Sequence, residues 1–274
     1  MKLKIRPTSV VPLRGGFGNQ LFCWAYGRAL EDRGHRVYFD RSHSLGRGFA
    51  LNGLIAGHQL ISVSRQVRNA LLSSRVQFLP GMTVVRERQD RPPVALLVNS
   101  AFSVHWGYWQ SLDYFSAVAD TLQTELGQWL DLDAKPATED RYCAIHVRRG
   151  DYVSDIGAAS ALGTLSLDYY ARSIARMREQ GVEDFRVFTD DREWALNNIL
   201  PLSNGITMSR KAEALEDFRG IALASSVITA NSSFSWWATF IGGAESRPVI
   251  SPKTWFADPS LDDSAITPDW WERI

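Results

Sequence analysis

The 274-residue chain carries 30 basic and 30 acidic residues, so its formal net charge is zero. This balance excludes a global field that would recruit nucleic acid or anionic lipid, and any site for a polyanion must be local. Hydrophobic residues make up 45% of the chain, as in ordinary globular proteins, and the length suits one large domain or two modest ones.

Neither export nor membrane insertion is indicated by the sequence. The N-terminus lacks the apolar core of a signal peptide, and no run approaches the roughly 20 apolar residues of a membrane span. Cys23 and Cys143 lie far apart, without metal-type spacing, which favours reduced thiols. We expect a cytoplasmic protein and leave open peripheral attachment at the inner face of a membrane.

The first half of the chain opens with the pattern strand, glycine turn, helix, strand. These elements are SVVPL (9–13), RGGFGNQ (14–20), LFCWAYGRALED (21–32) and HRVYFD (35–40). Residues 41–90 are weakly patterned and predict only a helix at 64–72. A buried strand is then expected at 93–100, followed by a helical segment from His105 to Trp129.

The polar stretch 131–141 contains Pro136 and is the best domain boundary. It divides the chain into an N-terminal domain, 1–135, and a C-terminal domain, 136–255. We expect the tail, 256–274, to pack back on the N-terminal domain.

Strands and helices alternate regularly in the second domain, which predicts a parallel sheet with ligands at the carboxyl ends of its strands. Strands are expected at YCAIHV (142–147), FRVFT (185–189), VITA (227–230) and RPVISP (247–252), and helices at 166–181, 190–200, 211–226 and 231–243. Ser166 is the expected N-cap of the first helix, and Gly181 follows its end. The Gly/Ala/Ser-rich residues 154–164 are expected to form a loop.

Three polar groups follow strand ends in this domain and would line one crevice of a parallel sheet. They are His146-Arg148-Arg149-Asp151, Thr189-Asp190-Asp191 and Asn231-Ser232-Ser233-Phe234. Arginine forks suit phosphate oxygens, and serines at a helix N-terminus direct N–H groups at an anion. The carboxylate of Asp190 or Asp217 could accept hydrogen bonds from the edge of a guanine or from a hydroxyl group. The Phe234 ring could stack on a base. Together they predict a nucleotide diphosphate pocket.

Each group alone also has a structural explanation. The arginines could form ion pairs with Asp151, and Thr189-Asp190 or Ser232-Ser233 could simply cap helices. His146 on an apolar strand is more often a core histidine than a ligand. We assign Trp236 and Trp237 to packing. The coincidence of three junctions favours the pocket.

The glycine turn of the first domain has a competing explanation. Gly16 and Gly18 open a βαβ unit, and Asp40 ends the next strand about where a dinucleotide fold places its ribose-binding acid. The third glycine position is Leu21, so the fingerprint is incomplete. An NAD(P)-dependent oxidoreductase therefore stays an alternative.

No metal is expected. Asp131 and Asp133 match the DxD motif of metal-dependent transferases, but they lie in the presumed linker. Two arginines can neutralise a diphosphate without a cation.

The ordered motifs resemble bacterial α-1,2-fucosyltransferases of glycosyltransferase family 11. They are GGFGNQLFCWAYGRAL, HVRRGDY, LSLDYYARSI, FTDD, ANSSFSWWATF and ISPKTWF…PDWW. The resemblance implies a GT-B fold, in which two Rossmann-like domains face each other across a cleft. It also implies metal-independent, inverting transfer of L-fucose from GDP-fucose to O2 of a galactose, with no cofactor. The partners would be the donor GDP-fucose and a galactose-containing oligosaccharide or lipid-linked glycan.

The resemblance also implies roles for single residues. His146, Arg148 and Arg149 match the motif whose first arginine binds the GDP phosphates, and Asn19 matches an asparagine beside the reacting sugar. Ser232, Ser233 and Phe234 match a nucleotide contact, with Asp190 and Asp217 as acidic positions near it. Gly16 stands where protein O-fucosyltransferases carry an arginine, for which Arg14 or Arg149 would compensate.

Several points stay open at the level of sequence. Asp151 and Asp40 are the candidates for a general base, and Asp151 would equally orient an arginine. Trp106, Tyr108 and Trp109 would stack on acceptor sugars or anchor their own segment. The rival functions are a fucosyltransferase of other linkage or acceptor, a protein O-fucosyltransferase, a non-catalytic nucleotide-sugar binding module and the oxidoreductase.

Overall fold

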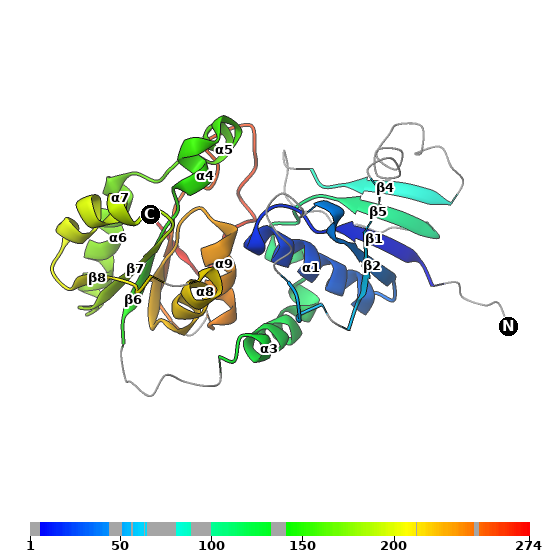
Figure 1. The fold of residues 1–274 in the computed structure, drawn as a ribbon, viewed down its shortest axis with the longest axis horizontal. Helices are drawn as coiled ribbons and strands as arrows, with labels where there is room; N and C mark the ends of the chain where they lie inside the picture. The colour runs from blue at the N-terminus through cyan, green and yellow to red at the C-terminus, as the bar shows by residue number, and fades with distance from the viewer. Residues whose placement is uncertain are drawn as a thin grey trace. The chain divides into compact units, whose positions relative to one another are not determined.

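The computed structural model of the protein describes residues 6–43, 51–55, 57–62, 64, 81–88, 100–132, 141–211, 213–243 and 247–274. The chain divides into two compact units, Met1–Leu122 and Gln123–Ile274, each built on its own parallel sheet (Figure 1). The predicted α/β class with two Rossmann-like domains is thereby confirmed.

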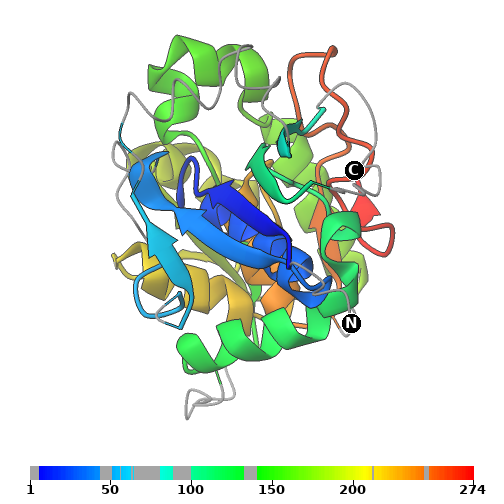
Figure 2. The ribbon, with the colours of Figure 1, turned by 90° about the vertical axis from the view of Figure 1, so that its right-hand side faces the viewer.

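The first unit has a five-stranded sheet in the order β3-β2-β1-β5-β4, with every described pairing parallel. Its strands are β1 (Thr8–Pro12), β2 (Arg36–Asp40), β3 (Gln59–Ile61), β4 (Met82–Arg86) and β5 (Phe102–Trp106). Helix α1 (Phe17–Asp32) connects β1 to β2 and packs on the sheet (Figure 2). Short 3-10 turns, η1 (Arg41–His43), η3 (Leu112–Tyr114) and η4 (Ser116–Val118), complete the described part, and α3 (Ala119–Trp129) spans the division between the units.

The second unit has a six-stranded parallel sheet in the order β11-β10-β9-β6-β7-β8. Its strands are β6 (Cys143–Val147), β7 (Phe185–Thr189), β8 (Ile206–Met208), β9 (Ser226–Ile228), β10 (Val249–Ser251) and β11 (Glu272–Arg273). Helices α6 (Leu167–Glu179) and α7 (Arg192–Asn198) cover one face, and α8 (Ala214–Leu223) and α9 (Ser233–Ile241) cover the other (Figure 1). The turn η5 (Leu200–Leu202) follows α7.

Strand β6 is buried along its whole length because it lies between β7 and β9 and is covered on both faces. Continuous apolar runs are typical of such a strand. The chain builds outward from β6 through β7 to β8, and then returns to add β9, β10 and β11 on the other side. The sheet therefore reverses its direction of winding between β6 and β9, and the first sheet does the same between β1 and β5. Ligands in doubly wound sheets bind at such switch points, beyond the carboxyl ends of the strands.

The elements expected around these strands are largely confirmed. Ser166 caps α6 by accepting from the Tyr169 N–H at 3.2 Å, and Gly181 follows the helix with a φ of +82°. Cys23 and Cys143 are buried free thiols.

Other expectations were wrong. Residues 154–164 are not a loop, because α4 (Gly150–Ser154) and α5 (Ile156–Leu162) occupy most of them. His105 and Trp106 end strand β5 and do not begin a helix. The division between units falls at Leu122 and Gln123, before the expected boundary at 135. The helix expected at 64–72 and most of the strand expected at 93–100 lie outside the described residues, as does most of the presumed linker.

The tail also differs from expectation, because it completes the second unit. Strand β11 pairs with β10, and the Trp236 indole donates to the Ile266 carbonyl at 2.7 Å. Trp271 packs on Trp236 with ring centroids 5.8 Å apart. Within the described part of the chain, no helix is long and apolar enough to cross a membrane.

Candidate functional site

The three polar junctions of the second unit meet at one edge of its sheet. They follow β9, β6 and β7, which are adjacent strands. The strands end nearly level, with Val147 opposite Thr189 and Ile145 opposite Ile228. Side chains also connect them: the Tyr152 hydroxyl donates to the Asn231 carbonyl at 3.0 Å, and Arg148 pairs with Asp190 at 2.7 Å. The predicted convergence is confirmed.

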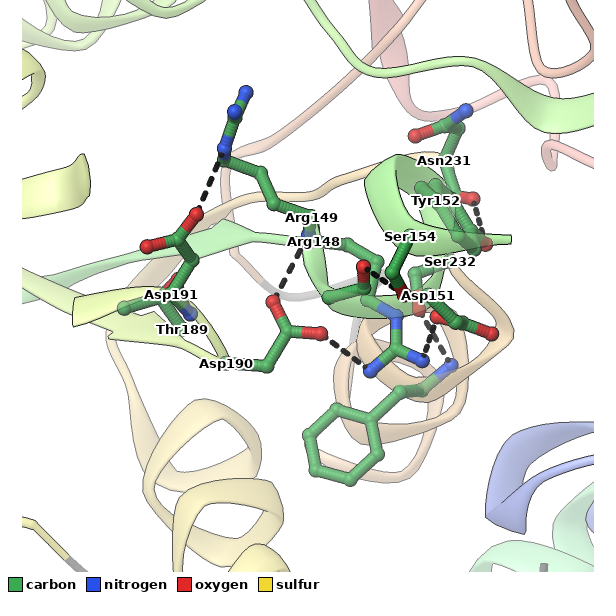
Figure 3. Close-up of polar contacts among 12 residues, drawn as sticks. Arg148, Arg149, Asp151, Tyr152, Ser154, Thr189, Asp190, Asp191, Asn231 and Ser232 are labelled. Atoms are coloured by element: carbon green, nitrogen blue, oxygen red, sulfur yellow. Dashed lines mark hydrogen bonds and ion pairs between the residues drawn. The ribbon is translucent and has the colours of Figure 1, made fainter. Parts of the chain in front are cut away.

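Arg148 lies at the centre of this edge, with its guanidinium between two carboxylates (Figure 3). One nitrogen bonds Asp190 at 2.7 Å and another bonds Asp151, while the side chain stays 29% exposed. The guanidinium also lies 5.4 Å from the centre of the Tyr152 ring. Such a cation is fixed in place yet accessible to a ligand from solvent.

Arg149 extends in a different direction, toward α7 (Figure 3). Its Nε bonds Asp191 at 3.1 Å, and its guanidinium lies 4.1 Å over the Trp194 ring. Successive residues leaving a strand point to opposite sides, so neighbours in sequence are separated in space. The structure therefore does not form the expected double-arginine clamp from these two side chains.

The Asp190 carboxylate accepts from both arginines, from the side chain of Arg148 and from the backbone N–H of Arg149. Its Oδ1 accepts from the Arg149 N–H at 2.9 Å, while Oδ2 accepts from the Arg148 guanidinium. A Cβ at Gly150 would lie 2.6 Å from the same carboxylate, so glycine is needed for this approach.

The helix cap at this junction is Asp191. Its carboxylate accepts from the Trp194 N–H at 3.1 Å, and its own N–H donates to the Thr189 hydroxyl at 3.0 Å. The cap is therefore one residue later than the expected Thr189-Asp190, and Asp190 faces Arg148 instead.

Ser232 caps α9, accepting from the Phe234 N–H at 3.3 Å. The cap leaves other N–H groups of the first helical turn directed outward, where an anion is stabilised. Ser233 and Phe234 are partly exposed in this first turn, whereas Trp236 and Trp237 are buried as expected. The capping and the anion-binding interpretations of these serines are compatible.

Phe234 packs between two aromatic rings. It stacks on His146, with centroids 5.5 Å apart, and meets Phe218 edge-on at 5.1 Å. His146 is 5% exposed, and burial lowers its pKa to about 3, so the ring is neutral at physiological pH. Among the described residues its Nδ1 has no hydrogen-bond partner. Buried polar atoms are normally paired, which makes this nitrogen a candidate ligand contact.

Asp217 lies on α8, next to the buried Phe218. Burial raises its pKa to about 6, and the nearby Arg192 guanidinium partly opposes this rise. A carboxyl group that titrates near neutrality is common at functional sites.

The remaining predicted residues belong to the first unit and lie around the start of α1. Gly15 has a φ of +70°, and a Cβ there would lie 2.7 Å from the Asn19 carboxamide. Gly16 is the N-cap position of α1, and Gly18 is buried within the helix. The Asn19 Oδ1 accepts from Gln110 at 2.8 Å. Asn19 is thereby linked to the end of β5.

Asp40 does not fit a ribose-binding role. It is 2% exposed, and it accepts from the backbone N–H and the hydroxyl of Ser42, both at 2.9 Å. It stabilises the turn after β2, which also removes it as a general-base candidate. Asp151 is engaged by Arg148, as its orienting role requires.

Within the described ranges no group of three or more His, Cys, Asp or Glu side chains could hold a metal ion. Asp131 is 72% exposed beside Arg219, and Asp133 lies outside those ranges.

The structure adds residues that sequence reasoning missed. Tyr152 ties α4 to the loop before α9, and Glu87 binds the Tyr108 N–H at 2.6 Å. Trp109 is fully buried, so it anchors its segment and offers no ring to a ligand. The signal that could have found Glu87 is its place directly after β4, at the same edge as Asn19.

Comparison with known proteins identifies the class of chemistry. Residues 93–273 match the family described as glycosyl transferase family 11. An alpha-1,2-colitosyltransferase of Escherichia coli is 29% identical over 97% of this chain and 98% of its own length. The O-antigen biosynthesis glycosyltransferase WbnK of Escherichia coli is 33% identical over 48% of this chain and 44% of its own.

Solved structures give more distant similarities. POFUT1 in complex with GDP-fucose aligns with 91% of this chain and 98% of its own, at 12% identity and a TM-score of 0.43. The E. coli heptosyltransferase WaaC with ADP-2-deoxy-2-fluoro heptose aligns with 97% and 92%, at 13% identity and a TM-score of 0.46. Because the family match covers most of the chain, the protein belongs to glycosyl transferase family 11 and is a glycosyltransferase.

Proposed function

We propose that this glycosyltransferase moves L-fucose from GDP-fucose to O2 of a galactose residue, with inversion and without a metal ion. The observation that carries the proposal is the position of Arg148. Its guanidinium lies at the switch point of the second sheet, at the end of the strand adjacent to the one that leads into α9. A fixed cation and a helix N-terminus at adjacent strand ends suit a diphosphate.

The proposed mechanism is a displacement at the anomeric carbon of the donor sugar. As the bond to GDP breaks, negative charge develops on the β-phosphate. Arg148 and the N-terminus of α9 stabilise this charge where it appears, which lowers the barrier more than it tightens ground-state binding. Asp190 and Asp151 hold the guanidinium in place beforehand, so little reorganisation is needed during reaction.

The nucleoside would be held by the groups beside this cation. The unpaired Nδ1 of His146 and the Asp217 carboxylate suit the hydrogen-bonding edge of guanine, and Phe234 supports the His146 ring. Arg149 then has a supporting role, because it joins the arginine turn to α7.

A closely related donor is the second candidate. The relative that matches along nearly its whole length is a colitosyltransferase, and colitose is fucose without its 3-hydroxyl group. A GDP-linked colitose would use the same phosphate contacts. The two donors therefore have to be separated by turnover and not by GDP binding.

The test is calorimetric titration with GDP, GDP-fucose, UDP and NADH in the presence of EDTA. Wild type is expected to bind the two GDP ligands selectively, and Arg148→Ala is expected to lose about 10²–10³ in turnover together with most of its GDP affinity. Arg172→Ala is the matched control, because it removes an exposed arginine that pairs with Asp168 on the same helix.

Binding of NADH with indifference to GDP would overturn the proposal in favour of the glycine turn as a dinucleotide site. An Arg148→Ala variant with wild-type turnover would show that another group stabilises the leaving diphosphate. GDP binding without transfer to any galactoside would leave a nucleotide-sugar binding protein.

A further inference from the structure

Glu87 holds the segment that follows β5 in the first unit. Its Oε2 accepts from the Tyr108 N–H at 2.6 Å, and its own N–H donates to the Trp106 carbonyl at 3.0 Å. A hydrogen bond to a carboxylate is charge-assisted, and such bonds are stronger and shorter than neutral ones. The backbone N–H groups of Trp109 and Gln110 are near enough to this carboxylate to lower its pKa. Glu87 therefore ties the start of the segment 108–110 to the end of β4.

The approach of Glu87 depends on a glycine and on an unusual backbone. A Cβ at Gly107 would lie 2.5 Å from the Glu87 Cβ and 2.8 Å from Oε2. Trp109 has a φ of +59°, a conformation that costs energy for a large side chain. Its ring is fully buried and stacks on Tyr26, with centroids 4.0 Å apart. Such strain persists only where surrounding contacts enforce it, and it gathers at functional sites.

The fixed segment carries groups of the kind that recognise sugars. The Gln110 carboxamide donates to Asn19 at 2.8 Å, which forms an amide pair between β5 and α1. The Arg14 guanidinium lies 4.3 Å from the Trp106 ring centre and 4.5 Å from that of Tyr108. Asn19, Gln110 and Arg14 are all partly exposed. Amide and guanidinium groups beside aromatic rings offer hydroxyl recognition together with a surface for sugar C–H faces.

These groups lie at the carboxyl edge of the first sheet. Arg14 follows β1 and the segment 107–110 follows β5, and the first sheet reverses its winding between these two strands. This edge is the place where an open parallel sheet binds its ligand. The first unit thus carries its own polar site, separate in the chain from the Arg148 cluster.

We propose that Glu87 is a positioning residue for an acceptor-sugar site: by holding the Tyr108 N–H beside Gly107, it fixes the segment that carries Gln110 and the rings beside Arg14, so that the Asn19–Gln110 amide pair and Arg14 are placed to bind acceptor hydroxyls. The inference rests on the proposed function, because it takes the acceptor to be a galactoside. Burial raises the pKa of Glu87, and the neighbouring backbone N–H groups and the Arg14 guanidinium oppose this rise.

The main test replaces Glu87 by Gln and measures transfer from saturating GDP-fucose to lactose as the galactoside probe. An amide keeps the shape but replaces one carboxylate oxygen by an NH₂ group, which is uncharged and cannot accept from the backbone N–H groups near it. We expect the KM for lactose to rise about tenfold, because a small misplacement of binding groups is costly. The kcat should stay within about threefold, and the Kd for GDP should be unchanged. Asp32→Asn, which neutralises an exposed carboxylate on α1, is the matched control.

A second variant covers the case in which Glu87→Gln fails to fold. Gly107→Ala places a methyl group against Glu87 and should raise the KM for lactose in the same way. Gly57→Ala is its control, since a Cβ there would meet no atom within 4 Å. Thermal unfolding of all four variants shows which of them are folded.

An unchanged KM in both Glu87→Gln and Gly107→Ala overturns the inference, and so does a collapse of kcat at unchanged KM, which would assign Glu87 to the chemical step. Wild type that binds GDP but neither binds lactose by saturation-transfer NMR nor transfers to it overturns the galactoside site and leaves the donor site standing. Failure to bind GDP at all would instead overturn the proposed function.

Discussion

Two adjacent arginines at the end of β6 have different environments, and this difference determines what each can do. Arg148 is held by two carboxylates and remains 29% exposed, whereas Arg149 is 18% exposed between Asp191 and the Trp194 ring. A guanidinium that packs on an aromatic ring gains cation–π stabilisation and is costly to move. Arg148 therefore keeps exposed surface with which to meet a phosphate oxygen while its two carboxylates hold it, whereas Arg149 stabilises the junction with α7.

Asp217 gives the donor site a pH dependence. Burial raises its pKa to about 6, so below that pH the carboxyl group is protonated and no longer accepts fully from a guanine edge. We expect the GDP affinity of wild type to fall as pH decreases from 8 to 5. Asp217→Asn should bind GDP weakly across the whole range, as calorimetric titration at each pH would show. Glu183→Gln, at an exposed carboxylate that is not among the groups acting on Asp217, should keep the wild-type profile.

Stability should change in the opposite sense, which separates binding from folding. The folded-state pKa lies above the usual value of 3.8, so ionisation opposes folding and stability falls as pH rises through about 4 to 6. Asp217→Asn removes this titration and should raise Tm at pH 8 relative to wild type, but not at pH 4. A variant that lost both GDP affinity and Tm at pH 8 would contradict the assignment.

The sequence predicts at which edge of the sheet the polar side chains of the site lie, but not which of these side chains pair with each other. Polar residues directly after apolar strands locate the edge of a parallel sheet, which is why Arg148, Asp190 and Ser232 were found. Whether Asp190 or Asp191 caps α7 depends on rotamers and on the clearance at Gly150, which no local pattern encodes. Glu87 was missed because its partners are backbone N–H groups about 20 residues later in the chain.

Helices and strands with a strong local sequence pattern were predicted correctly. Apolar runs between turns and the Ser166 cap predicted β6, α6, β7 and α9 to within about two residues. The loop expected at 154–164 was wrong because glycine, alanine and serine carry little periodic signal, and two short helices, α4 and α5, occupy most of it. Their placement comes from tertiary contacts such as the Tyr152 bond to Asn231, and sequence periodicity does not report these.

Arg247 shows how one residue can stabilise two helices. Neither α8 nor α9 has a basic residue in its last turn, and the cap N–H groups reach only some of their final carbonyl groups. The Arg247 guanidinium supplies them: Nη1 donates to Ala222 at 2.8 Å, and Nη2 donates to Thr239 at 2.9 Å. Burial lowers its pKa to about 10, which leaves it charged at neutral pH.

Replacing Arg247 should therefore destabilise the second unit strongly. Arg247→Met fills the same volume but leaves several buried carbonyl groups without donors, each costing about 1–3 kcal/mol. We expect the free energy of unfolding, measured in urea, to fall by at least about 2 kcal/mol. Arg176→Met on the exposed face of α6 should have little effect, as surface ion pairs usually contribute little. Equal losses in both variants would show that the shared helix cap is not stabilising.

At the scale of the whole molecule, the chain forms two α/β units and returns to the second one at its end. The alternation of strands and helices predicted both sheets, but the position of the tail did not follow from it. Residues 256–274 contain little regular structure, and their place is set by the burial of Trp271 against Trp236 and by the pairing of β11 with β10. Contacts between segments this distant in sequence have no local signature.

The final tryptophans test this placement, because two neighbours differ in burial. Trp271 is 2% exposed and packs on α9, whereas Trp270 is 47% exposed. Trp271→Ala removes a buried ring and should cost about 3–5 kcal/mol of unfolding free energy, with Trp270→Ala close to wild type. Since α9 begins with the Ser232 cap, loosening its far side should also weaken GDP binding, which the rise in Tm on adding GDP would report. If Trp271→Ala lost stability but kept its full response to GDP, the tail would support the core of the second unit without supporting the donor site.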